Sequence, residues 1–175
     1  MKSLIKQMRK IILNLAVSLD GFIEGPNGEF DWCFTDQDYG MKAFYSRIDT
    51  IFMGRKSYEL VKTMGDDLYK NKKIYVFSRT LKEVAPTEEL VTGNIENEIR
   101  QIKNSEGKDI WLFGGASLTS SFINLKLIDE FMLAVHPIIL AGGKPLFTNL
   151  KERASLQLQE AKTYSSGLVQ LFYTT

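Results

Sequence analysis

The most constraining stretch of the sequence is an apolar run that ends at a glycine pair. Residues 110–113 (Ile-Trp-Leu-Phe) lack the polar alternation of a half-exposed strand, which indicates a strand buried on both faces. Gly114 and Gly115 stop the run, and apolar residues at helical spacing begin directly afterwards, over 116–125. A strand, a glycine turn and a helix start favour an anionic ligand such as phosphate, because the first helical N–H groups are free. A simple tight turn is the alternative interpretation.

Strands and helices alternate through the first three quarters of the chain. Apolar, β-branched runs predict strands over 11–17, 50–53, 73–77, 89–92, 109–113 and 130–139. Apolar residues at steps of three and four predict helices capped by Thr35 and Asp38, over 54–64, after Asn94 and over 116–125. Two further strands, 156–162 and 168–174, follow as a hairpin with its turn at 165–167. We therefore expect residues 1–8 to be an extension and 9–175 to be one α/β domain, mostly parallel, with an antiparallel hairpin at one edge.

Composition excludes several classes of protein. The 22 basic and 21 acidic residues give a net charge of +1, which argues against a nucleic-acid binder. A single cysteine, Cys33, excludes an intrachain disulfide and suits a reducing cytoplasm, and one histidine, His136, removes any His-rich metal site. The first apolar run ends at Val17 and is too short for a secretory core or a membrane span. We expect a cytoplasmic protein without metal, membrane or nucleic-acid partners.

Three predicted strands end in residues suited to phosphate. The clusters are Gly54-Arg55-Lys56-Ser57, Ser78-Arg79-Thr80 and Gly114-Gly115-Ala116-Ser117. They combine guanidinium, ammonium and hydroxyl groups with helix N-termini, and in open α/β sheets ligands bind beyond the carboxyl ends of the strands. Two basic clusters on either side of one glycine turn indicate a ligand with two separated phosphate groups.

Each of these side chains also has an ordinary structural interpretation. Arg55 and Lys56 can be a solvated first helical turn, although the helix dipole disfavours basic residues there unless an anion is present. Arg79 can be a surface residue that follows a strand. Ser57 and Ser78 can be turn or capping residues.

Five segments occur in an order that resembles the dihydrofolate reductase fold. They are Ser18-Leu19-Asp20-Gly21-Phe22-Ile23 after the first strand, Met53-Gly54-Arg55-Lys56-Ser57-Tyr58-Glu59, Val76-Phe77-Ser78-Arg79, Phe113-Gly114-Gly115-Ala116 and Pro137-Ile138-Ile139-Leu140-Ala141-Gly142-Gly143-Lys144-Pro145-Leu146-Phe147. The likeness covers about residues 9–174. It is strongest to the riboflavin-biosynthesis reductase branch, the C-terminal reductase domain of the bifunctional deaminase-reductase. The resemblance implies a three-layer dihydrofolate reductase-like fold.

The resemblance also implies NADPH as the cofactor. Carried over onto this sequence, the cofactor-binding residues are Ala16, Gly54, Arg55, Lys56, Ser57, Ser78, Arg79, Thr80, Phe113, Gly114, Gly115, Ala116, Ser117 and Leu118. In the family the two basic turns hold the adenosine 2′-phosphate and the pyrophosphate, the Gly-Gly turn holds the pyrophosphate, and the first strand meets the nicotinamide. The loop over 19–28 would then cover the nicotinamide and gate the site.

Reduction by NADPH also needs a proton, which a carboxylic acid or water can supply. Candidate acids are Asp20, Asp31, Asp36 and Asp38. Asp20 matches the acid of the riboflavin-type Ser-x-Asp-Gly loop and is the first candidate for a substrate contact. Asp36 and Asp38 bracket the position at which folate reductases carry a carboxylate after the loop tryptophan, here Trp32. The structural alternatives are an Asp-Gly turn for Asp20 and helix capping for Asp36 and Asp38.

Three functions are compatible with this sequence. The leading hypothesis is an NADPH-dependent reductase of the riboflavin-biosynthesis type, acting on a small heterocyclic or ribosylaminopyrimidine substrate. The others are a true dihydrofolate reductase and a non-catalytic NADPH-binding module. The apolar segment 131–135 and the terminal strands can form an exposed sheet edge or face, and a homodimer, as the family forms, would cover it.

Overall fold

The computed structural model describes residues 8–65, 69 and 71–175, so the predicted extension lies outside the described residues except for Met8. The elements are β1 (Ile11–Ser18), β2 (Phe22–Glu24), α1 (Met41–Arg47), β3 (Ile48–Gly54), α2 (Arg55–Met64), β4 (Lys73–Phe77), β5 (Glu88–Val91), α3 (Ile95–Asn104), β6 (Asp109–Gly114), α4 (Ala116–Asn124), β7 (Glu130–His136), β8 (Lys144–Pro145), β9 (Gln157–Thr163) and β10 (Val169–Thr174).

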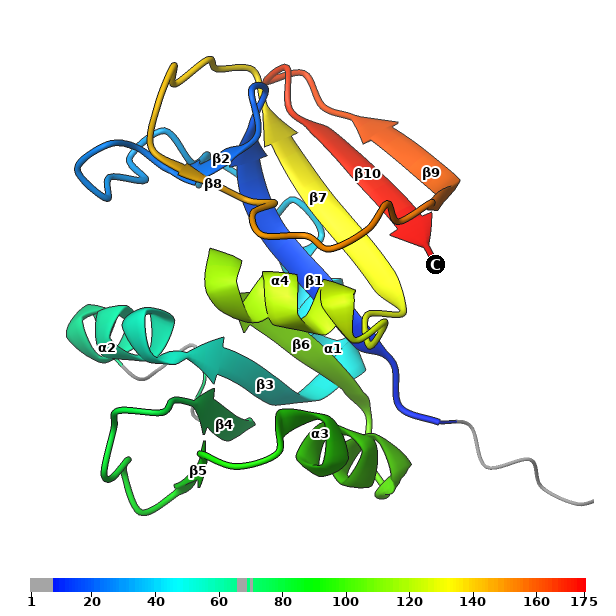
Figure 1. The fold of residues 1–175 in the computed structure, drawn as a ribbon. Coiled ribbons are helices and arrows are strands. Elements are labelled where there is room, and N and C mark those ends of the chain that lie inside the picture. The colour runs from blue at the N-terminus through cyan, green and yellow to red at the C-terminus, as the bar shows by residue number, and fades with distance from the viewer. Residues whose placement is uncertain (1–7, 66–68, 70) are drawn as a thin grey trace, which may run out of the picture.

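Eight strands form one sheet in the order β5-β4-β3-β6-β1-β7-β10-β9 (Figure 1). Neighbouring strands from β5 to β7 run parallel, whereas β10 is antiparallel to both β7 and β9. The predicted mostly parallel sheet with a C-terminal antiparallel hairpin is confirmed. The parallel strands place their carboxyl ends at one edge of the sheet, and this edge positions the site.

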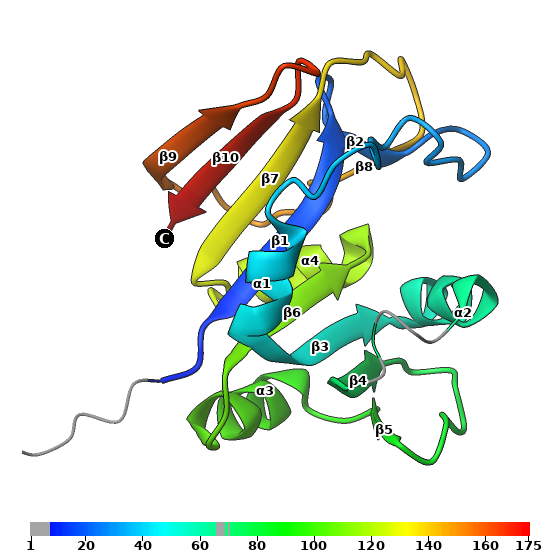
Figure 2. The ribbon, with the colours of Figure 1, turned by 180° about the vertical axis from the view of Figure 1, so that it is seen from behind.

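Helices cover both faces of the sheet, which gives three layers (Figures 1 and 2). On one face α3 and α4 pack through Ile99 and Phe122 onto Leu112 of β6. On the other face α1 and α2 pack with Trp111, the next residue of β6 toward the N-terminus. Because successive residues of β6 face opposite layers and both layers are apolar, the uninterrupted run in the sequence follows from burial on both sides.

The first helix begins later than the sequence predicts. Gly40, at φ 80°, is the N-cap residue and α1 starts at Met41, so Thr35 does not cap the helix. Asp38 accepts a hydrogen bond from the Lys42 N–H at 3.0 Å through its carboxylate. Its carbonyl oxygen also accepts one from the Met41 N–H at 2.9 Å. The capping role predicted for Asp38 is therefore confirmed, but the left-handed turn at Gly40 sets the boundary.

Two predictions near the carboxyl edge of the sheet differ from the structure. Strand β7 ends at His136 and not at Ile139, because the Ile138 N–H turns back to the His136 carbonyl oxygen at 2.8 Å. The predicted loop segments around Phe22–Glu24 and Lys144–Pro145 pair with each other as a short antiparallel sheet. We call this β2–β8 pair the flap.

Candidate functional site

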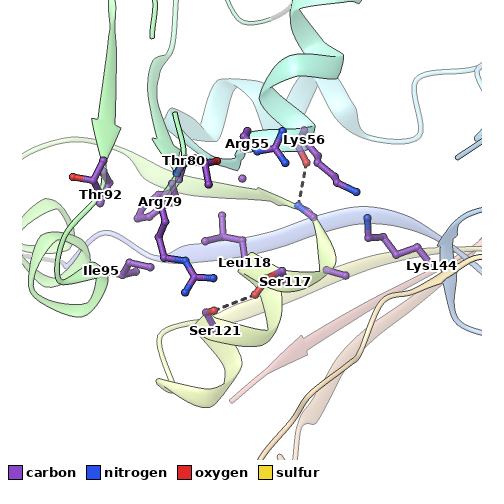
Figure 3. Close-up of a pocket in the computed structure, with 17 residues that line it drawn as sticks. Arg55, Lys56, Arg79, Thr80, Thr92, Ile95, Ser117, Leu118, Ser121 and Lys144 are labelled. Atoms are coloured by element: carbon purple, nitrogen blue, oxygen red, sulfur yellow. Dashed lines mark hydrogen bonds between the residues drawn. The ribbon is translucent and has the colours of Figure 1, made fainter. Parts of the chain in front are cut away.

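A cavity of about 620 Å³ opens where β3, β4 and β6 end (Figure 3). The predicted residues that line it are Gly54, Arg55, Lys56, Ser57, Ser78, Arg79, Thr80, Gly115, Ala116, Ser117 and Leu118. The structure thus brings together all three basic or glycine-rich strand ends. They meet because β4, β3 and β6 are neighbours in the sheet and run in the same direction.

Two helix N-termini without side-chain caps face this cavity. The N-cap residues of α2 and α4 are Gly54 and Gly115, and neither helix has an acidic residue in its first turn. Serine, threonine, aspartate or asparagine at an N-cap normally satisfies a free N–H group. The free N–H groups of both helices are therefore available to an anion, and both helix dipoles favour it.

The glycine turn holds the two helix starts together. The Gly115 N–H donates to Ser57 Oγ at 3.1 Å, so Ser57 joins the start of α2 to the start of α4. Gly114 has a φ of 106°, which favours glycine, and the Gly114–Gly115 peptide bond is cis. A Cβ atom added at Gly54 would lie 3.5 Å from the Gly114 carbonyl oxygen, so the backbones approach closely. Both β3 and β6 end in glycine in the sequence, and in the structure these two glycines lie next to each other.

The cavity is basic. None of the described residues that line it is acidic. Arg55 pairs with Glu59 at 2.9 Å on α2 itself, whereas Lys56 and Arg79 have no carboxylate within 4 Å in the described part of the chain. Ser78 Oγ accepts hydrogen bonds from two backbone N–H groups that follow Arg79 in the chain, at 3.1 and 3.0 Å, and so shapes the turn that presents this arginine.

Several residues that line the cavity were not predicted from the sequence. They are Phe77, Val91, Thr92, Ile95, Ser121 and Lys144. Thr92 follows β5, so the rule that ligands gather at strand ends would have found it. Ser121 lies one helical turn beyond Ser117 on α4, a spacing that places both on one side of the helix. For Lys144 the sequence offers no local signal, because it reaches the cavity from the flap.

Three predicted cofactor residues lie outside the cavity lining. Gly114 is in the turn itself and Phe113 packs on the α1 face, with its ring centroid 4.9 Å from that of Trp111. Ala16 lies on β1 two residues from Asn14, whose side-chain amide contacts the Met41 sulfur of α1 at 3.8 Å. Ala16 and Asn14 therefore share the face of β1 that α1 covers.

Asp20 is held by three hydrogen bonds away from this cavity. Its carboxylate accepts the Ser18 hydroxyl at 2.6 Å and the N–H groups of Leu140 and Ala141 at 3.1 and 2.9 Å. The Ser18 hydrogen bond is the largest influence on the pKa of Asp20, and with the two N–H groups it lowers the pKa against the opposing effect of desolvation. The ionised Asp20 carboxylate therefore joins the end of β1 to the loop that precedes β8, through Leu140 and Ala141.

Two of the other three candidate acids, Asp36 and Asp38, also have local partners. Asp36 accepts the Tyr39 hydroxyl at 2.8 Å, and Asp38 caps α1 as described. Neither lines the cavity, and neither does Asp20. A catalytic role for Asp20, Asp36 or Asp38 stays a prediction.

The described residues hold neither a membrane-spanning helix nor a metal cluster. Among them, no helix combines the length and the apolar character needed to cross a bilayer. The same part of the chain contains no group of three or more His, Cys, Asp or Glu side chains placed to hold a metal ion.

The fold and the site define an α/β protein with a basic, glycine-rich cavity at the carboxyl edge of a mostly parallel sheet. The chain belongs to the RibD C-terminal domain family, whose model matches residues 9–170. It is 49% identical to the uncharacterized protein YyaP and 36% identical to the uncharacterized protein YwjB, both from Bacillus subtilis strain 168. These alignments cover 95% and 94% of this chain and 95% and 97% of the two relatives.

Solved structures share the fold. A candidate riboflavin-biosynthesis protein from Shewanella sp. PV-4 superposes with a TM-score of 0.85 at 29% identity, over 94% of this chain and 98% of that one. The diaminohydroxyphosphoribosylaminopyrimidine deaminase/5-amino-6-(5-phosphoribosylamino)uracil reductase from Thermotoga maritima gives 0.72 at 15% identity, over 95% of this chain and 56% of that one. The predicted dihydrofolate reductase-like, riboflavin-reductase type of fold is confirmed.

Proposed function

We propose that this protein is an NADPH-dependent reductase of the riboflavin-biosynthesis type. It would transfer hydride from NADPH to a small heterocyclic or ribosylaminopyrimidine substrate, as a 5-amino-6-(5-phosphoribosylamino)uracil reductase does. Family membership supports the reaction class. The observation that carries the cofactor assignment is the meeting of two uncapped helix N-termini with Lys56 and Arg79 in one cavity, whose described lining residues include no acid.

The residues present fit a phosphorylated dinucleotide. The backbone N–H groups of α4 and α2 and the ammonium of Lys56 suit a diphosphate, and Arg79 with Thr80 suits a second phosphate.

The chain's own residues would bind and orient the reactants. Bound NADPH supplies the hydride. The start of α4, Lys56 and Arg79 would fix the phosphates, and the loop over 19–28 would exclude water from the nicotinamide end. Asp20 holds that loop to the segment before the flap as an ionised group, and we therefore assign the proton to a water molecule or to another acid.

One observation favours a second candidate, a protein that binds NADPH without turning it over. Three of the four candidate acids already have structural partners: Asp20 anchors a loop, Asp36 accepts a tyrosine hydroxyl and Asp38 caps a helix. Steady oxidation of NADPH with a ribosylaminopyrimidine or with dihydrofolate would exclude this candidate and would separate the two reductase types. Tight binding of NADPH without oxidation by either substrate would select it.

The first test concerns the 2′-phosphate, which NADPH carries and NADH lacks. We expect Arg79→Ala to weaken NADPH by about 10- to 100-fold and NADH by less than about threefold, because a hydrogen bond to a charged group contributes roughly 1.5–3 kcal/mol. Titration of nicotinamide fluorescence measures both affinities. Arg100→Ala is the matched control, since Arg100 pairs with Glu96 on the exposed side of α3 and lies outside the cavity lining. Equal losses for the two nucleotides would show that Arg79 does not contact the 2′-phosphate.

A further inference from the structure

Lys144 lines the cavity, but it comes from the flap and not from the ends of the central strands. It belongs to β8 of the flap, which pairs with β2 and not with the eight-stranded sheet. In Figure 3 its side chain enters opposite α2 and points toward Lys56, while Arg79 lies on the other side of the site. Apart from Arg55, which pairs with Glu59, the basic groups of the cavity therefore lie at two separate places, Lys144 with Lys56 at one and Arg79 at the other.

The backbone around Lys144 is fixed by contacts with the loop after β1. A Cβ atom added at Gly143 would lie 2.1 Å from the Glu24 carbonyl oxygen, so the two segments cross in close contact. Leu146 is 1% exposed and donates its N–H to the Gly21 carbonyl oxygen at 2.9 Å. The position of Lys144 is thus tied to the segment 19–28 that we expect to cover the nicotinamide.

The ammonium of Lys144 has a carboxylate partner within the flap. Its Nζ atom lies 3.1 Å from Glu24 Oε1, and the two side chains are 31% and 37% exposed. A half-exposed pair of this kind contributes little to stability, so Lys144 can exchange its partner at small cost. Lys56, which faces Lys144, and the positive end of the α4 dipole both make this part of the cavity attractive to an anion.

We propose that Lys144 binds the diphosphate of the nucleotide and that Glu24 competes with this diphosphate for the Lys144 ammonium. The inference rests on the proposed function, because it takes the nucleotide to be NADPH. Lys144 lies toward Lys56, on the opposite side of the cavity from Arg79 (Figure 3), so we expect it to contact the part that NADPH and NADH share. Ligand binding then moves the ammonium from Glu24 to the phosphate and fastens the flap over the site.

The first experiment measures the affinities of NADPH and NADH for Lys144→Met. We expect both affinities to fall by the same factor, about tenfold, because the diphosphate is common to both nucleotides. This differs from Arg79→Ala, which discriminates between them. Lys144→Arg should stay within about threefold of the wild type because it keeps the charge. Lys126→Met is the matched control, since Lys126 pairs with Glu152 at the same 3.1 Å but lies outside the cavity lining.

The second experiment removes the competing carboxylate. We expect Glu24→Gln to tighten NADPH and NADH by about two- to fivefold, and to have no effect when combined with Lys144→Met. If Glu24 and Lys144 only maintain the structure of the flap, both Glu24→Gln and Lys144→Met should bind NADPH and NADH more weakly. Unchanged affinity in Lys144→Met, or weaker binding in Glu24→Gln, overturns the assignment even if wild-type protein binds NADPH selectively. Failure of the wild type to bind either nucleotide overturns the proposed function, and this inference with it.

Discussion

His136, the last residue of β7, is a buried histidine with a hydrogen-bond partner at each ring nitrogen. It is 3% exposed, its Nδ1 atom lies 2.9 Å from the Ala134 carbonyl oxygen, and its Nε2 atom accepts the Phe34 N–H at 3.1 Å. These contacts require a neutral ring with the proton on Nδ1. The rings of Trp32 and Phe34 pack edge-on against it. The single histidine therefore holds the segment before α1 to the end of β7.

At this scale we predict a pH-dependent stability. Burial lowers the pKa of His136 below its ordinary value of 6.5, against two backbone contacts that raise it. The unfolded chain therefore binds the proton more readily, and the free energy of unfolding falls as the pH drops from 6.5 toward the lowered pKa. The loss is about 1.4 kcal/mol for each tenfold difference in proton affinity.

Urea unfolding between about pH 5 and pH 7.5 measures this dependence. His136→Gln removes the only histidine of the chain and should flatten the curve in this window. An equally steep curve in the variant would assign the effect to other groups.

The flap is the element that the sequence pattern did not predict. Gly143 directly precedes its strand β8, and the backbone there leaves no room for a side chain. Gly143 has a φ of 123° and crosses the Glu24 carbonyl oxygen at close contact. We predict that Gly143→Ala lowers the free energy of unfolding by about 1–3 kcal/mol through backbone strain. Gly142→Ala should be neutral or stabilising by up to about 1 kcal/mol, because an added Cβ would meet only Pro26 Cγ at 3.7 Å. Urea unfolding compares the two, and equal stabilities would disprove a tight crossing.

At the scale of the whole molecule, the exposed edge strand β9 is a surface through which the predicted homodimer could form. Each residue of β9 is exposed, and one of its edges is unpaired in the sheet. Antiparallel pairing of two β9 strands about Ala161 would place Glu160 of each copy opposite Lys162 of the other, which is a favourable cross-strand pair. We therefore predict a dimer joined through this edge.

Light scattering after size-exclusion chromatography measures the assembly. Glu160→Lys should weaken the dimer by about tenfold, because two like-charge pairs replace two opposite-charge pairs, and the added exchange Lys162→Glu should restore it. If the wild type is a monomer, or if neither substitution changes the stability of the dimer, assembly through β9 is contradicted.

The sequence predicted most elements of this fold because their signals are local. The bounds of β4 and α2 match the predicted segments, and Asn94 caps α3 by accepting the Asn97 N–H at 3.3 Å. The three strand ends were also identified, since glycine, basic and hydroxyl residues stand next to apolar runs. Convergence of these ends in one cavity followed from the general rule that parallel strands end at one edge.

What the sequence determined by itself is therefore the set of strands and helices and the residues at their ends, because apolar periodicity and turn chemistry act between residues close in the chain. Tertiary structure alone decided that Lys144 enters the cavity, that Asp20 anchors a loop 120 residues away, and that His136 holds Phe34. The pairs Asp20–Leu140, Phe34–His136 and Glu24–Lys144 are each more than 100 residues apart in the chain, and only the assembled sheet brings them together.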